Sequence, residues 1–229
     1  MPQGLVRGYP LMTPDGPARV EPQPKRAIVF FDGQNLFYAA REAFGYTYPN
    51  YDAQALAEWV CGQNGWQLEE VRFYTGIPTV EDNPKWNTFW SHKLSAMGKL
   101  GVHVFTRHLR YRNRPVVLPD GTRTSVLVGQ EKGIDVRIAL DIVRAAREGR
   151  CDVIVVFSQD QDLSEVAEEV RVIARQQSRW LRIVSAFPTS PTCANRRGIN
   201  KTDWVRITRQ VYDACLDRRD YHFGETTGT

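Results

Sequence analysis

The chain has 229 residues, a formal net charge of +4 and a sequence pI of about 8.9. Hydrophobic residues make up 42% of it and charged residues 24%, which is enough apolar material to bury a core and excludes a chain disordered throughout. Its apolar runs are far shorter than the roughly 20 residues of a membrane-spanning helix, and the first residues lack the apolar core of an export signal. We therefore expect a cytoplasmic protein with no membrane partner.

The cysteines are too few and too scattered for a zinc site. No Cys-x-x-Cys pair occurs, and the chain has only four histidines. Without an export signal we expect reduced thiols at Cys61, Cys151, Cys193 and Cys215.

Strand-like and helix-like segments alternate along the chain. A proline-rich stretch over 1–25 predicts a flexible arm, residues 26–220 one domain, and residues 221–229 a flexible tail. Apolar runs predict strands over 27–31, 71–74, 102–106, 153–157, 181–187 and 204–207. Helical spacing and capping residues predict helices over 35–44, 52–61, 84–99, 134–148, 162–176 and 208–218. Such alternation predicts an α/β fold with a mainly parallel central sheet.

The segment 107–130 departs from this alternation and predicts a β-hairpin insertion. Pro119-Asp120-Gly121 is a strong turn signal, and residues 124–128 can return as the second arm. On a strand, Arg110, Arg112 and Arg114 lie on one face and Tyr111 on the other. With Arg107, these arginines either follow a phosphate backbone or form a charged edge that protects the hairpin from aggregation.

Four aspartates follow apolar strands or open a helix, at places that can meet. Asp32 follows the strand over 27–31, Asp160 and Asp162 follow the strand over 153–157, and Asp135 opens the helix over 134–148. The carboxyl ends of parallel strands share one edge of a sheet, where ligands bind. Carboxylates there can hold Mg²⁺ or Mn²⁺ and serve phosphodiester hydrolysis. Each aspartate alone could instead cap a helix.

Other polar residues surround this predicted acidic centre. Asn35 and Ser158 can orient a carboxylate, water or phosphate oxygen, and Lys132 can meet substrate phosphate at the rim. Asp141 lies about 120° around the helix from Asp135, so we expect it to pair with Arg137 or Arg144 on the helix surface. Basic residues at 196, 197 and 201 form a second candidate for substrate binding.

The tryptophans favour a core or an interface over base stacking. Trp86 and Trp90 are four residues apart and therefore share one helical face. That face can pack inside the domain or form a homodimer contact.

Three motifs resemble the NYN domain, a branch of the PIN-like ribonucleases. They are Phe31-Asp32-Gly33-Gln34-Asn35, Glu131-Lys132-Gly133-Ile134-Asp135 with Ala139-Leu140-Asp141, and Ser158-Gln159-Asp160-Gln161-Asp162-Leu163. The resemblance covers about residues 26–210. It implies a three-layer α/β/α fold, similar to the Rossmann fold, and metal-dependent endonuclease chemistry on RNA.

The same resemblance implies an acidic centre of Asp32, Asp135, Asp160 and Asp162, with Asn35 and Ser158 beside it. Asp141 and, more weakly, Asp203 match acidic positions of the family. The glutamines at 159 and 161 replace the small residues of many relatives, which raises the question of how open the metal site is.

These patterns leave two functional hypotheses of different classes. The first is a Mg²⁺- or Mn²⁺-dependent endoribonuclease, and the second is an RNA-binding regulatory module with an inactive site. A small-molecule phosphohydrolase is disfavoured because Asp32 does not begin an Asp-x-Asp motif, and the chain has no P-loop motif.

Overall fold

A computed structural model describes residues 20–221. Most of the predicted arm over 1–25 and all but the first residue of the predicted tail over 221–229 lie outside the described residues. Tyr221, the last described residue, is buried against the domain. Within residues 20–221, no helix combines the length and apolar character that crossing a bilayer requires.

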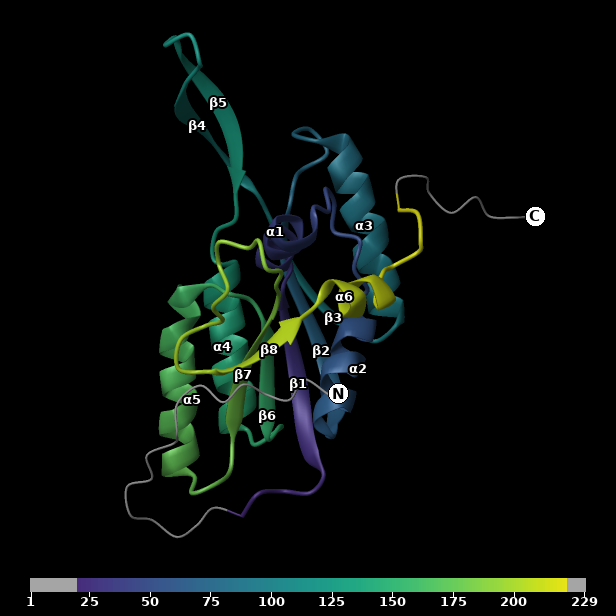
Figure 1. Ribbon diagram of the computed structural model, residues 1–229, viewed down its shortest axis with the longest axis vertical. Helices are drawn as coiled ribbons and strands as arrows, with labels where there is room; N and C mark the ends of the chain where they lie inside the picture. Colours follow the sequence, from purple (N-terminus) through teal and green to yellow (C-terminus); the bar gives the residue numbers. More distant parts are fainter. Residues whose placement is uncertain (1–19, 222–229) are drawn as a thin grey trace, which may run out of the picture.

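Six parallel strands form the central sheet, in the order β3-β2-β1-β6-β7-β8 (Figure 1). The strands are β1 (Lys25–Asp32), β2 (Trp66–Ile77), β3 (His103–His108), β6 (Val153–Phe157), β7 (Arg182–Pro188) and β8 (Asp203–Ile207). From β1 the chain builds outward through β2 and β3, then returns to the other side of β1 as β6. The carboxyl ends of β1 and β6 therefore lie side by side where the direction of sheet building reverses, the usual location of a ligand site in open α/β sheets.

Helices cover both faces of the sheet, as predicted for a three-layer α/β/α fold. One face packs against α1 (Gly33–Phe44), α2 (Ala53–Asn64), α3 (Pro84–Lys99) and α6 (Arg209–Ala214). The other face packs against α4 (Ile134–Arg147) and α5 (Ser164–Gln176). Strand β1 serves both cores, with Val29 and Phe31 on the first face and Ile28 and Phe30 on the second. Because both faces are covered, β1 and β6 are apolar throughout rather than alternating.

Capping side chains begin the helices where the sequence predicts them. Asp32 and Asp52 accept hydrogen bonds from the backbone N–H groups of Asn35 and Ala55, at 3.0 and 3.1 Å. Asn83 caps α3, whose first residue is Pro84. Each cap satisfies a backbone donor that would otherwise have no partner in the first turn.

Two elements differ most from their predicted bounds, and the others agree within about three residues at each end. Strand β2 begins at Trp66 rather than at 71, because its first residues pair with the start of β1. Helix α6 ends at Ala214 rather than at 218. Beyond it, the backbone N–H of Asp217 donates to the Asn50 carbonyl and the Asp217 carboxylate accepts from Lys93, so tertiary contacts replace the last helical turn.

The predicted hairpin consists of β4 (Arg110–Val117) and β5 (Arg123–Gln130), paired antiparallel. It extends beyond the carboxyl ends of the sheet strands, at the top of Figure 1. The register places Arg110, Arg112 and Arg114 on one face, opposite Gln130, Val128 and Val126, and all three arginines are exposed. Arg107 belongs instead to the end of β3.

Trp90 is buried and packs on Phe73, while Trp86 is partly buried against the same core. Their shared face therefore packs against the core of the domain. The four cysteines are free thiols, as predicted.

Candidate metal centre

Three carboxylates from separate parts of the chain meet at the carboxyl ends of β1 and β6. Asp32 ends β1, Asp160 follows β6, and Asp135 lies in the first turn of α4. One oxygen from each of the three lies within 4.8 Å of the others. Their convergence follows from the parallel pairing of β1 with β6, which aligns Phe31 with Phe157 and so brings the next residues of both strands to one edge.

Neutral donors fix the carboxylate of Asp32. Its Oδ1 accepts from the Asn35 backbone N–H, and its Oδ2 accepts from the Ser158 hydroxyl at 3.1 Å. The Ser158 oxygen in turn accepts from the Asp160 backbone N–H, and the Asn35 side-chain oxygen accepts from the Gln159 N–H at 2.9 Å. The two predicted supporting residues thus tie the end of β1 to the turn after β6.

The centre concentrates negative charge without a positive partner. The pKa of Asp32 is raised to about 7, chiefly by burial: the charges of Glu131 and Asp135 add to the rise, while the hydrogen bonds from Asn35 and Ser158 oppose it. Burial also raises the pKa of Asp135, with added repulsion from Asp160 and Asp162. Among the described residues, no lysine or arginine forms an ion pair with Asp32, Asp135 or Asp160. A buried group of like charges in this state is stabilised by a bound cation.

The donor set fits a hard divalent cation. Carboxylate oxygens are the preferred ligands of Mg²⁺ and Mn²⁺. Because one oxygen of each carboxylate lies within 4.8 Å of the others, the three could ligate one such ion together. Within residues 20–221 this group offers three carboxylate ligands, which would leave coordination positions for water and substrate.

Glu131 is a fourth acid of the centre that the sequence reasoning did not assign. It lines the same cavity as Asp32 and Asp135, and its Oε1 accepts hydrogen bonds from the Gly76 N–H and the Thr75 hydroxyl. Burial raises its pKa to about 7, with a further contribution from the charge of Asp135. The available signal was its position four residues before Asp135, but its burial depends on contacts with the end of β2.

Asp162 occupies a different position from the other predicted acids. Its side chain is exposed, and it is not a member of the group of three. Its backbone N–H donates to Asp160 Oδ1 at 3.0 Å, and its charge raises the pKa of Asp135. Its role as a metal ligand stays a prediction.

Asp141 lies in a structural ion-pair network rather than in the centre. Its Oδ2 accepts from Arg137 Nε and from the Tyr74 hydroxyl, each at 2.9 Å, and lies 3.6 Å from Arg72 Nη1. The predicted pairing with Arg137 is therefore present. The expected surface location is wrong, because Asp141 packs between α4 and β2 and is only 3% exposed. Asp203 pairs with Arg182 at 2.7 Å, at the start of β8.

The predicted basic residues divide into two groups. Arg107 packs over the Phe105 ring and against Gly133, and donates to the Lys132 carbonyl at 3.4 Å, so it supports the turn that carries Glu131. Lys132 is exposed beside the acids. The hairpin that carries the other arginines extends away from the sheet (Figure 1), and its base contributes Gly129 and Gln130 to the same cavity.

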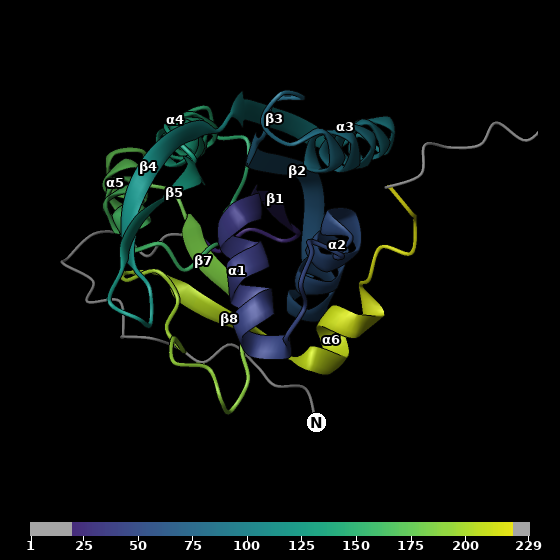
Figure 2. The ribbon, with the colours of Figure 1, turned by 90° about the horizontal axis from the view of Figure 1, so that it is seen from above.

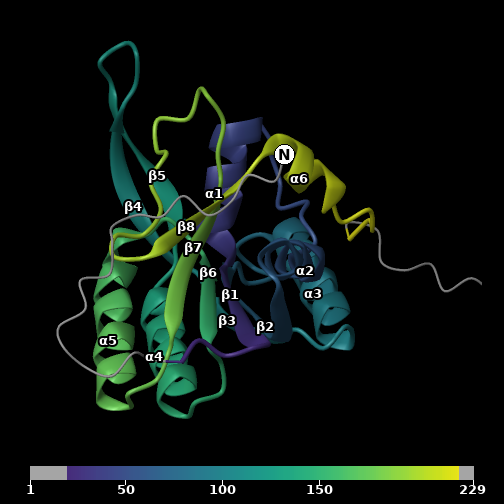
Figure 3. The same cartoon turned by 60° about the horizontal axis from the view of Figure 1, so that its bottom comes forward.

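Gln159 and Gln161 point away from the metal-binding oxygens and hold the loop over 189–202. Their side-chain amides donate to the carbonyls of Arg197 and Gly198, at 2.8 and 3.1 Å. In the middle of the loop, the backbone N–H groups of Ala194 and Asn195 donate to Glu42 of α1. In Figure 3 this yellow-green loop rises on the same side of the molecule as the hairpin. The two glutamines therefore hold this loop and do not line the space over the acids.

A cavity of about 360 Å³ opens over the acids. It is lined by Asp32, Gln34, Asn35, Tyr38, Gly129, Gln130, Glu131, Asp135 and Asp160. Figure 2 looks down on this end of the molecule, with α1 at the centre and the hairpin to one side. A second cavity of about 450 Å³ lies between α3 and the segment after α6, away from the three carboxylates.

The NYN domain family model matches residues 26–191. The chain belongs to the NYN domain family, a branch of the PIN-like nuclease superfamily. A search of curated proteins gave no significant match.

Two solved structures show weak similarity to this NYN protein. VPA0982 of Vibrio parahaemolyticus, a protein of unknown function, is 18% identical, with a TM-score of 0.47 over 83% of this chain and 96% of that one. MurG of Acinetobacter baumannii is 11% identical, with a TM-score of 0.31 over 80% of this chain and 45% of that one. Both scores are below 0.5 and carry no argument about function.

Proposed function

We propose that this NYN protein is a Mg²⁺- or Mn²⁺-dependent endoribonuclease. One observation carries the proposal: three carboxylates on adjacent strand ends and a helix start meet within 4.8 Å without a lysine or arginine partner among the described residues. Membership of a nuclease superfamily supports hydrolysis as the chemistry. Asp141 differs from these three carboxylates, because it is a buried acid whose charge is paired with arginines.

The chain's own residues have distinct roles in this proposal. Asp32, Asp135 and Asp160 hold the ion, with Asp162 available at the rim, while Asn35 and Ser158 fix Asp32. A bound divalent ion activates water and offsets negative charge on the reacting phosphate. Glu131 Oε2 makes no hydrogen bond within residues 20–221, so it is available to accept a proton inside the cavity.

Substrate binding is assigned to the exposed cations around the cavity. Lys132 contacts phosphate at the rim, and Arg110, Arg112 and Arg114 bind successive phosphates along the hairpin, while Arg107 acts by holding the 131–133 turn. Alternate residues on a strand are about 6.7 Å apart and face the same way, an arrangement that suits an extended backbone. The free thiols support a reducing compartment such as the cytoplasm.

The test is cleavage of end-labelled RNA by purified protein, with Mg²⁺, Mn²⁺ or EDTA, beside an Asp160→Asn variant. We expect cleavage by the wild type with either metal, none in EDTA, and none by the variant. An Asp213→Asn variant is the matched control, because Asp213 is exposed and pairs with Arg209 on α6, outside the site.

Binding of RNA by the wild type without cleavage under any metal condition would favour the regulatory module instead. Equal cleavage by the wild type and the Asp160→Asn variant would refute the assignment of the centre. Terbium luminescence measures ion binding separately from cleavage, and the Asp160→Asn variant should weaken it.

A further inference from the structure

The cavity over the acids combines two kinds of surface. Its floor is acidic, formed by Asp32, Asp135 and Asp160 with Glu131 beside them. Its walls carry uncharged groups, with Gln34 and Tyr38 from α1 on one side and Gln130 from the base of the hairpin on the other. A phosphate group needs only the floor with its ion, so the walls require a separate explanation.

Tyr38 is an exposed aromatic ring beside this acidic floor. It is 53% exposed, lies in the second turn of α1 and lines the same cavity as Asp32. Phe37 packs against it with ring centroids 5.3 Å apart, which limits the orientations open to the ring. A held aromatic ring with an open face is the platform on which proteins stack unpaired bases.

The two glutamines of the walls have free hydrogen-bonding capacity. Gln34 is four residues before Tyr38 and therefore on the same face of α1. Within residues 20–221, neither the Gln34 nor the Gln130 side-chain amide makes a hydrogen bond, whereas Gln159 and Gln161 are both engaged. An amide offers a donor and an acceptor together, the combination that reads the edge of a base.

We propose that this cavity receives one unpaired nucleobase next to the scissile phosphate, stacked on Tyr38 and contacted at its edge by Gln34 and Gln130. The inference rests on the proposed function for the identity of the substrate as a polynucleotide. A volume of about 360 Å³ falls within the range of small-ligand sites, about 300–1,000 Å³. A base in this position must leave its stack, so the protein acts on single-stranded RNA in preference to a duplex.

The test measures stacking directly in a background that does not cleave. Asp160→Asn protein with Mg²⁺ is titrated into a short single-stranded RNA that carries one 2-aminopurine, and fluorescence is recorded. We expect quenching on binding, retention of quenching with Tyr38→Phe, and its loss with Tyr38→Ala together with about tenfold weaker affinity. A duplex of the same sequence should bind about tenfold more weakly.

Tyr48→Ala is the matched control, because Tyr48 is 45% exposed but lines the other cavity. It should leave both quenching and affinity unchanged. Gln34→Ala and Gln130→Ala should reduce the difference in affinity between RNAs that differ only in the base at the probe position. Equal quenching and affinity for Tyr38→Ala and the parent protein would overturn the inference.

This outcome is separable from failure of the proposed function. If wild-type protein cleaves RNA and Tyr38→Ala cleaves with unchanged KM, only the base site is wrong. If no RNA is cleaved but quenching depends on Tyr38, the base site stands and the hydrolase assignment fails.

Discussion

Asp32 and Asp141 are equally buried, at 3% exposure each, yet their surroundings are opposite. Asp141 accepts from Arg137 and lies beside Arg72, so its charge is compensated by the protein. Asp32 accepts only from neutral donors and faces other acids, and its pKa rises to about 7. A buried carboxylate with arginines is part of the scaffold, whereas one without a cation depends on an ion from solution.

The largest expected effect comes from removing one acid of the centre. Asp135→Asn should lower the rate of RNA cleavage at least about 100-fold, because the bound ion supplies several kcal/mol of transition-state stabilisation. In EDTA the same change should raise the melting temperature, since it relieves repulsion with Asp160 and Asp162. Calorimetry and single-turnover cleavage measure the two effects, and wild-type rates with an unchanged melting temperature would contradict both.

The matching change at the paired acid should do the reverse. Asp141→Asn removes the anion paired with Arg137, while Arg72 keeps its pair with Glu70, and the change should lower the free energy of unfolding by about 3 kcal/mol. Cleavage per folded molecule should stay within about twofold of the wild type. Urea unfolding and cleavage below the transition measure these quantities, and a stable but inactive variant would move Asp141 into the site.

Asp217 is a third acid, and like Asp141 it has cationic partners in the protein. Burial alone would raise its pKa, but Arg219, the buried Lys93 and Tyr221 outweigh burial and lower it to about 2. The depressed pKa stabilises the fold above the ordinary value of 3.8, by ~2 kcal/mol, and this contribution is lost as pH falls toward 2.

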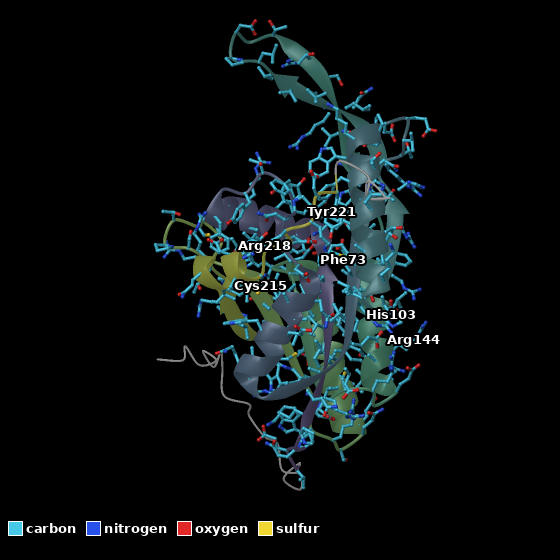
Figure 4. All side chains as sticks on the ribbon, turned by 90° about the vertical axis from the view of Figure 1, so that its right-hand side faces the viewer. Phe73, His103, Arg144, Cys215, Arg218 and Tyr221 are labelled. Carbon is cyan, nitrogen blue, oxygen red and sulfur yellow. The ribbon has the colours of Figure 1, made fainter. Side chains whose placement is uncertain are left out.

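Lys93→Met should therefore lower the free energy of unfolding at pH 6. As the pH falls from about 4 to 2, the variant should lose less additional stability than the wild type. Urea unfolding at pH 6 and pH 3 measures the difference, because the wild type should lose more stability between these values than the variant. Figure 4 shows Cys215, Arg218 and Tyr221 of this C-terminal segment well apart from His103 and Arg144, so the change should leave the α4 face unaltered. If the wild type and the variant lost the same amount of stability between pH 6 and pH 3, the role of Lys93 would be contradicted.

The smallest expected effect concerns cations that have no acid nearby. Replacing Arg110, Arg112 and Arg114 with glutamine should reduce the slope of log affinity against log salt by about 2, because each phosphate contact on single-stranded RNA contributes about 0.7. The matched control replaces Arg144, Arg147 and Arg175 of α4 and α5, which removes the same charge elsewhere. If the slope of log affinity against log salt is the same for the two triple variants, the hairpin arginines do not bind phosphate and instead protect the strand edge of the hairpin from aggregation.

Much of the site was predictable because its signals are local. An apolar strand followed by an aspartate identifies a sheet edge, and this pattern predicted Asp32 and Asp160 together, with Asp135 from the helix start. Glu131 was not assigned because its burial depends on the end of β2, more than fifty residues away in sequence. Arg107 was assigned to the hairpin because an arginine-rich run does not reveal where one strand ends and another begins.

The sequence by itself determined the alternation of strands and helices, the caps that begin α1 and α2, and the set of acids available to a metal. Only the tertiary structure decided which of these acids share one space and which are neutralised by arginine. The physical reason is range: strand and cap signals arise within a few residues, whereas the charge state of a buried carboxylate depends on partners brought by distant strands. The position of Tyr38 likewise depends on tertiary structure, because α1 and the base of the hairpin together form the cavity that places its ring beside the acids.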